Sequence, residues 1–321
     1  MAGASGPRVA SDVAAFRALA ESGPLFGSLA SRGAIGWEAW AHAAHALEAR
    51  LPADPLRERR IHHLYVPTLL WILGECVRGP RRPVVVGLSA PQGSGKTTLV
   101  RELLPLLSDA GVQVAAVSID DFYLPREEQV RLAQEHSGNR ILEHRGAPGT
   151  HDVALGEATL ERLRHLGPGE TMGVPRYDKT LHGGRGDRSP VANWPKVTGP
   201  LDLVMLEGWC VAFRPVSGVA LANPALEPVN AYLARYVRWQ RQIDALLVWS
   251  AKELEQIVGW RVEAEERSRA EGRPGLDRAS IEDYIRRFLP VYAAYARTAT
   301  LEPPARERQL EVVLSAERLP I

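Results

Sequence analysis

The chain is poor in cysteine and in long apolar runs, and each shortage excludes a class of protein. Its 321 residues include two cysteines, Cys76 and Cys210, which are too few for a disulfide framework or a thiolate metal site. No apolar run approaches the roughly 20 residues that span a bilayer, and no basic segment followed by an apolar one opens the sequence. We therefore expect a soluble, cytoplasmic protein that does not bind membranes.

The chain also lacks an excess of either charge and contains little lysine. Lysine and arginine together number 39, against 38 acidic residues, so no global basic field attracts nucleic acid. The lysines are Lys96, Lys179, Lys196 and Lys252, and arginine supplies the remaining positive charge. This bias makes a single arginine weak evidence for function. We expect a small-molecule partner and no nucleic acid; the sequence does not specify an oligomeric state.

What the sequence does contain is a phosphate-binding loop. An apolar, β-branched run leads into small residues and then into a helix start, so that consecutive backbone N–H groups can surround a polyphosphate. Lys96 is placed to reach the β and γ phosphates, and Thr97 to ligate Mg²⁺. Ala90 replaces the first glycine of the usual pattern, which matters only if that position needs a conformation barred to alanine. The loop comprises Ala90, Pro91, Gln92, Gly93, Ser94, Gly95, Lys96, Thr97 and Thr98.

The spacing of apolar residues predicts two kinds of structure along the chain. Helical spacing at 11–21, 36–51 and 56–79 predicts an N-terminal helical extension over 1–80. The rest, 81–321, is expected to form the nucleotide-binding domain, with short apolar runs alternating with helices. This alternation predicts an α/β fold, a parallel sheet covered by helices on both faces. The predicted strands are 84–89, 113–119, 201–206, 243–249 and 310–315.

Two segments of this domain are expected to carry function. Residues 126–200 form a long, polar insertion rich in glycine and proline, with one helix expected at 154–166; a flexible surface excursion is the alternative. Residues 252–275 predict a lid helix on which Arg261 and Arg269 lie on nearly the same face and would close over the phosphates. Alternatively, these arginines are solvated and pair with nearby glutamates.

Carboxylates follow two of the predicted strands. Asp120 and Asp121 come directly after the strand at 113–119, where one would accept the proton of a substrate hydroxyl and the other would assist Mg²⁺ or orient its neighbour. Adjacent strand residues point to opposite sides, so one of the two is expected to face the reaction. Glu207 follows the strand at 201–206 and is expected near the metal, which it would contact through Mg²⁺-bound water.

 The alternative for Glu207 is a glutamate that is solvated or paired with a nearby cation.

The insertion also concentrates polar side chains. Guanidinium groups bind carboxylates through paired hydrogen bonds, and tyrosine or aspartate can hold hydroxyl groups, so we expect an anionic substrate that carries a hydroxyl. His151 and His182 have the wrong spacing for a metal site. The cluster consists of Arg145, His151, Asp152, Arg176, Tyr177, Asp178, Lys179, His182, Arg185, Asp187 and Arg188.

Six blocks, in this order, resemble the D-glycerate 3-kinase family. They are APQGSGKTT (90–98), SIDDFYL (118–124), LEHRGAPGTHD (142–152), VPRYDKTLHGGRGDR (174–188), LEGW (206–209) and WRVEAEERSRAEGRPG (260–275). The resemblance covers about residues 83 to 300. That family is similar in turn to the phosphoribulokinase, uridine kinase and bacterial pantothenate kinase group.

The resemblance implies a P-loop NTPase fold and transfer of a phosphoryl group from ATP, with Mg²⁺, to the 3-hydroxyl of D-glycerate. It implies that Asp120 is the base and that Asp121 supports it. The residues expected to act in catalysis are Lys96, Asp120, Arg261 and Arg269. Those expected to bind the metal are Thr97, Asp120 and Glu207, and those expected to bind the substrate are Asp121, Tyr123, Arg145, His151, Arg176, Tyr177 and Arg185.

Two other functions stay open at this point. A kinase of the same kind could act on another hydroxyl acceptor, such as a nucleoside or a pantothenate-like alcohol, although an arginine-lined site disfavours a nucleoside. A nucleotide-dependent switch is the other alternative. Against it, the sequence contains no N-K-x-D guanine motif, and a carboxylate directed at a hydroxyl serves little purpose in a switch.

Overall fold

A five-stranded parallel sheet forms the centre of the protein. The computed structural model describes residues 16–33, 35–79, 82–217, 223–272, 277–302 and 305–321. The strand order is β2-β7-β1-β8-β9, and every pairing in this sheet is parallel. The fold predicted from the sequence is therefore confirmed. The strands are β1 (Val84–Ser89), β2 (Val114–Ser118), β7 (Leu203–Gly208), β8 (Ala245–Ala251) and β9 (Gln309–Leu314).

The central strands are apolar along their whole length because both of their faces are covered. All residues of β1 and β7 are buried, and β1 begins with three β-branched valines that suit a pleated, packed surface. Gly87 interrupts β1 for a steric reason. A Cβ at this position would lie 2.9 Å from the Cδ1 atom of Ile243, so glycine lets this side chain pack closely against the strand.

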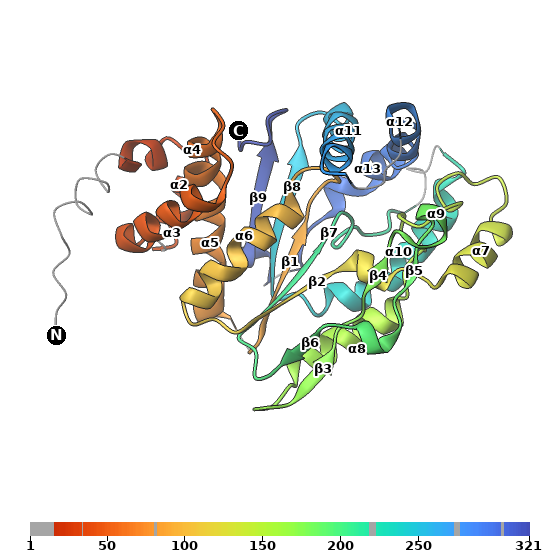
Figure 1. Ribbon diagram of the computed structural model, residues 1–321, viewed down its shortest axis with the longest axis horizontal. Helices are drawn as coiled ribbons and strands as arrows, with labels where there is room; N and C mark the ends of the chain where they lie inside the picture. The colour runs from red at the N-terminus through yellow and green to blue at the C-terminus, as the bar shows by residue number, and fades with distance from the viewer. Residues whose placement is uncertain (1–15, 34, 80–81, 218–222, 273–276, 303–304) are drawn as a thin grey trace.

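Helices cover the two faces of the sheet. On one face, α5 (Val66–Arg78) contacts β1, and α6 (Lys96–Asp109) contacts β2 and β7. On the other face, α8 (Val153–Arg164) contacts β7 and packs against α10 (Leu226–Gln240). The chain runs from β1 toward β2 on one side and later returns past β1 to β8 on the other, so right-handed crossovers would place the connecting helices on opposite faces. Figure 1 shows the resulting layers.

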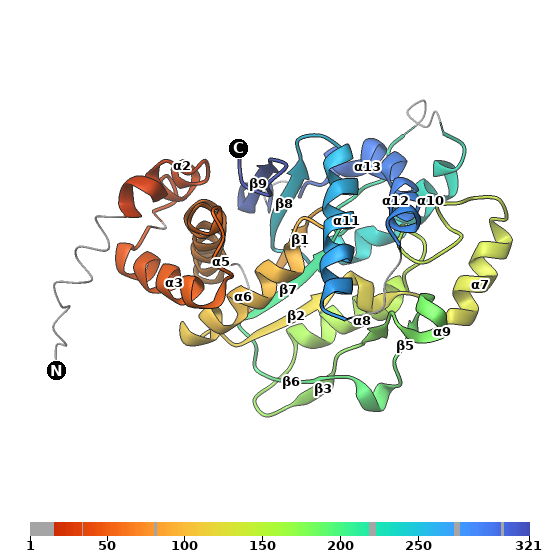
Figure 2. The same ribbon diagram turned by 45° about the horizontal axis from the view of Figure 1, so that its top comes forward.

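The remaining helices follow β8 or form the insertion. After β8 come α11 (Glu255–Ala270), α12 (Arg278–Arg286) and α13 (Leu289–Tyr295), and then two short 3-10 helices, Ala296–Thr298 and Ala305–Arg308. Helices α7 (Arg126–Glu135), α9 (Leu181–Gly184) and α12 lie toward the end of the molecule opposite the N-terminal helices in both views (Figures 1 and 2), and α11 stands nearer the middle.

The N-terminal helices pack onto the same core as the sheet. Residues 16–21 are helical, and the rest of the helix predicted at 11–21 lies outside the described residues. The later helices are α2 (Phe26–Ala30), α3 (Trp37–Arg50) and α4 (Arg57–Arg60), followed by a π-helix at Ile61–Tyr65 that leads into α5. Helix α3 contacts α5 and α6, so these elements extend the layer that covers the sheet.

The insertion contains more structure than the one helix predicted for it. Besides α8 and α9 it holds α7, a 3-10 turn at Val191–Asn193 and two small antiparallel pairs: β3 (Thr171–Gly173) with β6 (Lys196–Thr198), and β4 (Tyr177–Asp178) with β5 (Asp187–Arg188). The sequence reading missed α7 because its ten residues are mostly polar and bury only Gln129 and Leu132. No helix within the described ranges has the length and apolar character needed to cross a membrane.

Candidate active site

A cavity of about 1680 Å³ opens where the strands end. The phosphate-binding loop, the turn after β2, the end of β7, the insertion, α11 and α12 all contribute to its wall. Parallel strands bring their carboxyl ends to one edge of the sheet, which is why segments far apart in the sequence meet here. From the phosphate-binding loop, the residues that line the cavity are Gln92, Gly93, Lys96 and Thr97.

The phosphate-binding loop has the backbone conformation that its glycines suggest. Gly95 precedes α6 with φ 96°, in the left-handed region, and Gly93 has φ 76°. Ala90 donates its N–H to the carbonyl oxygen of Gly208 at 2.9 Å. Among the described residues, the non-glycine positions with positive φ are His182 and Arg318, so Ala90 occupies an ordinary conformation. Alanine at the first position of the pattern is therefore compatible with the loop.

Three neighbours hold this loop in place. A Cβ at Gly93 would lie 2.6 Å from the backbone carbon of Trp260, so α11 packs directly on the loop. Arg318 donates from Nε to the carbonyl oxygen of Gly93 at 2.9 Å, and the hydroxyl of Tyr292 accepts the N–H of Gln92 at 3.0 Å. No local sequence pattern points to Arg318 or Tyr292, because both act on the loop from distant parts of the chain.

Asp120 lies at the cavity, held through both of its carboxylate oxygens. Tyr123 donates its hydroxyl to Oδ1 at 2.9 Å, and Lys179 donates from Nζ to Oδ2 at 2.5 Å. Burial alone would raise the pKa of Asp120, but the ammonium groups of Lys179 and Lys96 outweigh it and hold this pKa well below its usual range. Asp120 is thus an oriented carboxylate, ready to accept a hydrogen bond.

Asp121 is directed to a different task. Strand β2 ends at Ser118, and Ile119–Phe122 form a 3-10 turn, so the two aspartates do not sit on a strand as predicted. The side chain of Asp121 accepts the N–H of Tyr177 at 3.2 Å and pairs with Arg176 at 2.5 Å. Although Asp121 lines the cavity, these contacts make it an anchor for the β4 segment.

Glu207 and Thr97 form a site that suits a hard cation. The Thr97 hydroxyl lies 3.5 Å from Oε1 of Glu207, and Oε2 of Glu207 is buried with no hydrogen-bond partner among the residues that the structure describes. Burial raises the pKa of Glu207, while Lys96 opposes this effect. No group of three or more His, Cys, Asp and Glu side chains in the described part of the chain could hold a metal ion. Mg²⁺ needs only one or two protein ligands when substrate phosphates and water complete its coordination shell. Thr97 and Glu207 therefore fit this ion.

Arginines from the insertion line the far side of the cavity. Arg145 stacks over the ring of Tyr177, with 5.6 Å between the guanidinium carbon and the ring centroid, and donates to the carbonyl oxygen of Gly184 at 2.8 Å. Arg185 contacts His144. Arg126, which the sequence analysis did not select, also lines the cavity. The cavity therefore has a cationic side, suited to an anionic group.

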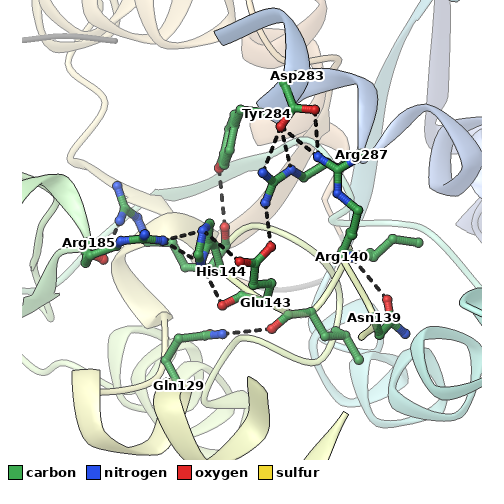
Figure 3. Close-up of polar contacts among 12 residues, drawn as sticks. Gln129, Asn139, Arg140, Glu143, His144, Arg185, Asp283, Tyr284 and Arg287 are labelled. Carbon is green, nitrogen blue, oxygen red and sulfur yellow. Dashed lines mark hydrogen bonds and ion pairs between the residues drawn. The ribbon is translucent and has the colours of Figure 1, made fainter. Parts of the chain in front are cut away.

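Helix α12 is tied to the insertion by ion pairs beside these arginines. Figure 3 shows Arg287 between Asp283 and Glu143. Its distances to these two carboxylates are 2.8 and 2.9 Å, and Arg140 pairs with Asp283 at 2.6 Å. The hydroxyl of Tyr284 also donates to the carbonyl oxygen of Arg145 at 3.3 Å. These contacts close one wall of the cavity.

The structure does not bring every predicted residue to the cavity. The His151 ring is buried, stacks on Tyr123 with centroids 4.5 Å apart and lines a separate cavity of about 410 Å³. Burial lowers the pKa of His151 to about 4, so the ring is neutral. Arg176 and Tyr177 lie behind the lining residues, where they contact Asp121.

The two predicted lid arginines differ in position. Arg261 lines the cavity and pairs with Glu265 at 2.9 Å, whereas Arg269 is exposed and lies outside the lining. Lys179 is the main residue that the predictions did not assign a role, although it belongs to the polar cluster. The chain contains four lysines, and this scarcity of lysine is the sequence feature that could have pointed to Lys179.

The chain is similar to known kinases. No family model matches the chain. The chloroplastic D-glycerate 3-kinase of Arabidopsis thaliana is 38% identical over 280 residues, which cover 83% of this chain and 61% of that protein. An uncharacterized kinase of Schizosaccharomyces pombe, mug58, is 32% identical over 80% of this chain and 97% of its own length.

A solved structure extends the similarity to the fold. The D-glycerate 3-kinase of Cryptococcus neoformans superposes with a TM-score of 0.71 and 29% identity, over 79% of this chain and 96% of that one. The similarity thus covers 83% of the chain in sequence and 79% in structure. The chain belongs to the D-glycerate 3-kinase family of P-loop kinases.

Proposed function

We propose that the protein transfers the γ-phosphoryl group of ATP to the 3-hydroxyl of D-glycerate, giving 3-phosphoglycerate and ADP. The observation that carries the proposal is the meeting of three parts in one cavity: the phosphate-binding loop with Lys96, the carboxylate of Asp120, and the cationic side formed by Arg145 and Arg185. D-glycerate has one group for each of the last two parts, a hydroxyl and a carboxylate. The names of the Arabidopsis and Cryptococcus relatives support the same acceptor.

The loop and α6 bind the triphosphate in this proposal. The backbone N–H groups at the start of α6 point out of the helix and carry the positive end of its dipole, which favours phosphate. Lys96 adds a full charge beside them. Thr97 and Glu207 would hold Mg²⁺, which neutralises charge on the phosphates when it is bound.

Asp120 orients the acceptor. Its carboxylate accepts a hydrogen bond from the substrate hydroxyl and takes the proton as the oxygen attacks phosphorus. Arg145 and Arg185 fix the substrate carboxylate, and this holds the hydroxyl in one direction. From α11, Arg261 would approach the transferring group. The cytoplasmic location stays a prediction and forms part of the proposal.

The first experiment is a measurement of ADP release by the purified protein with Mg-ATP and a set of acceptors. D-glycerate, L-glycerate, uridine, pantothenate and a reaction without acceptor are compared, and phosphorus NMR identifies the phosphorylated position. We expect release to depend on D-glycerate and the product to be 3-phosphoglycerate. Stronger stimulation by uridine or pantothenate would reject the proposed acceptor, and hydrolysis that no acceptor changes would favour a nucleotide-dependent switch.

Two substitutions test the assigned roles. Asp120→Asn keeps the shape of the side chain but cannot take a proton, and Lys96→Ala removes the charge at the phosphates. We expect each to lower kcat by at least about 100-fold without unfolding the protein. Asp109→Asn, an exposed aspartate at the end of α6, is the matched control. Near-normal turnover by Asp120→Asn would remove its role as the base.

A further inference from the structure

Lys179 occupies a place that the proposed mechanism has not used. Of the four lysines in the chain, Lys96 and Lys179 line the large cavity. The Lys179 ammonium lies 2.5 Å from Oδ2 of Asp120, on the side of the carboxylate opposite the Tyr123 hydroxyl. Its positive charge therefore lies next to the oxygen atoms that would accept the proton of the acceptor.

The backbone around Lys179 is fixed from both sides. Before it, the N–H of Tyr177 binds Asp121, and β4 pairs with β5. After it, the carboxylate of Asp178 accepts the N–H of Thr180 at 2.8 Å. These contacts hold the backbone of the segment from which the lysine side chain extends. The position of the ammonium beside Asp120 therefore depends on an anchored backbone.

The pair with Asp120 is expected to contribute little to the stability of the fold. The Lys179 side chain is 53% exposed, and ion pairs with an exposed partner typically contribute between 0 and about 1 kcal/mol. A lysine in such a pair can be removed without unfolding the protein. Since the ammonium lies at the cavity beside Asp120, it is also placed to face a ligand that the cavity holds.

We propose that Lys179 is a positioning residue for phosphoryl transfer, an inference that rests on the proposed function. It holds Asp120 in the orientation that receives the acceptor hydroxyl. During the step the acceptor O–H proton passes to Asp120, the acceptor oxygen forms a bond to the γ-phosphorus, and the bond from that phosphorus to the bridging oxygen breaks with its electron pair leaving on ADP. Lys179 stays protonated throughout and acts through its charge and its hydrogen bond.

The test compares Lys179→Met and Lys179→Arg with the wild type in the D-glycerate assay. We expect Lys179→Met to lower kcat by about 100-fold while KM for ATP changes by less than about threefold, since the phosphate-binding loop is intact. Lys179→Arg keeps the charge and should recover part of the loss, although the guanidinium differs in shape. Lys196→Met changes an exposed lysine of β6 and should leave kcat unchanged.

A double variant separates positioning from a structural role. If Lys179 acts through Asp120, adding Lys179→Met to Asp120→Asn should lower kcat little further. Independent, multiplicative losses would overturn the inference, as would a Lys179→Met variant with near-normal kcat. The wild type decides the underlying function in the same assay: if another acceptor is used, the comparison is made with that acceptor, and inactivity with all acceptors rejects both proposals.

Discussion

Asp120 and Asp121 are neighbours in one turn, yet their side chains have different contacts and different roles. Asp120 points to the cavity, where Tyr123 and Lys179 hold its two oxygens, while Asp121 turns to Arg176 and the backbone of β4. The 3-10 turn after β2 separates them in space, because adjacent residues of this turn do not share a direction. One residue is therefore available to the substrate, and the other holds the segment that carries Lys179.

Glu207 provides a test of metal binding. Its buried Oε2 has no hydrogen-bond partner among the described residues, so a cation would complete its environment. We expect Glu207→Gln to raise the Mg²⁺ concentration needed for half-maximal activity by about 10-fold or more, since an amide is a weaker ligand than a carboxylate. The measurement is a titration of activity with Mg²⁺ at saturating ATP. Glu227→Gln, an exposed residue of α10, is the control, and an unchanged Mg²⁺ requirement would contradict the role of Glu207.

The phosphate-binding loop is held by elements from the end of the chain. Helix α11 packs on Gly93, α13 supplies Tyr292, and Arg318 follows β9. Arg318 also pairs with Glu263 at 2.8 Å and lies over the ring of Trp260, so it joins the loop to α11. Its φ of 62° is unusual for a residue other than glycine, which indicates that these contacts impose the conformation.

Arg318→Ala tests this support. Losing the bond to the Gly93 carbonyl should let the loop relax, and we expect KM for ATP to rise several-fold while KM for the acceptor changes little. Steady-state kinetics with each substrate varied in turn measures the two constants. Arg241→Ala removes an exposed arginine after α10 as a control. Equal changes in both KM values would indicate a general loss of structure instead.

A continuous apolar core joins the N-terminal helices to the sheet. It includes Trp40 and Trp71 from those helices together with Val85 and Leu206 from the strands. Glu75 of α5 is buried and pairs with Arg308 at 2.7 Å, which links this part of the chain to the segment before β9. The division of the chain at residue 80 stays a prediction, and these contacts support a helical extension that packs as part of the same core.

The buried His62 makes stability depend on pH. Trp40 donates its ring N–H to Nδ1 of His62 at 3.0 Å, and burial lowers the pKa of His62 from 6.5 to about 4. The unfolded chain therefore binds a proton at higher pH than the folded chain does. The associated stability is complete above pH 6.5 and is lost as the pH falls toward 4.

Denaturant unfolding of wild type and His62→Gln at about pH 7 and pH 5 measures this effect. Between pH 7 and pH 5 we expect the free energy of unfolding of the wild type to fall by about 2 kcal/mol more than that of the variant. His42→Gln, an exposed histidine of α3, should behave like the wild type. If wild type and His62→Gln lose equal stability on acidification, His62 is not the group responsible.

The local pattern of residues was enough to predict the sheet and the phosphate-binding loop. Apolar runs of strand length, turn residues and a glycine-rich helix start act over a few neighbours, so they can be recognised without knowing the fold. The predicted strand at 84–89 matches β1, and the helix expected to start at the phosphate-binding loop is α6. Helix α7 was not predicted, because its mostly polar sequence resembles that of a loop.

Tertiary structure alone decided which side chains face each other. Lys179 and Asp120 are 59 residues apart, and Arg318 and Gly93 are 225 apart, so no local spacing relates them. His151 and Arg145 both belong to one polar block, yet His151 packs behind Tyr123 and Arg145 lines the cavity. The reason is physical: sequence sets which groups can bind a phosphate, a hydroxyl or a carboxylate, whereas the packing of the insertion against the sheet sets the direction in which each one points.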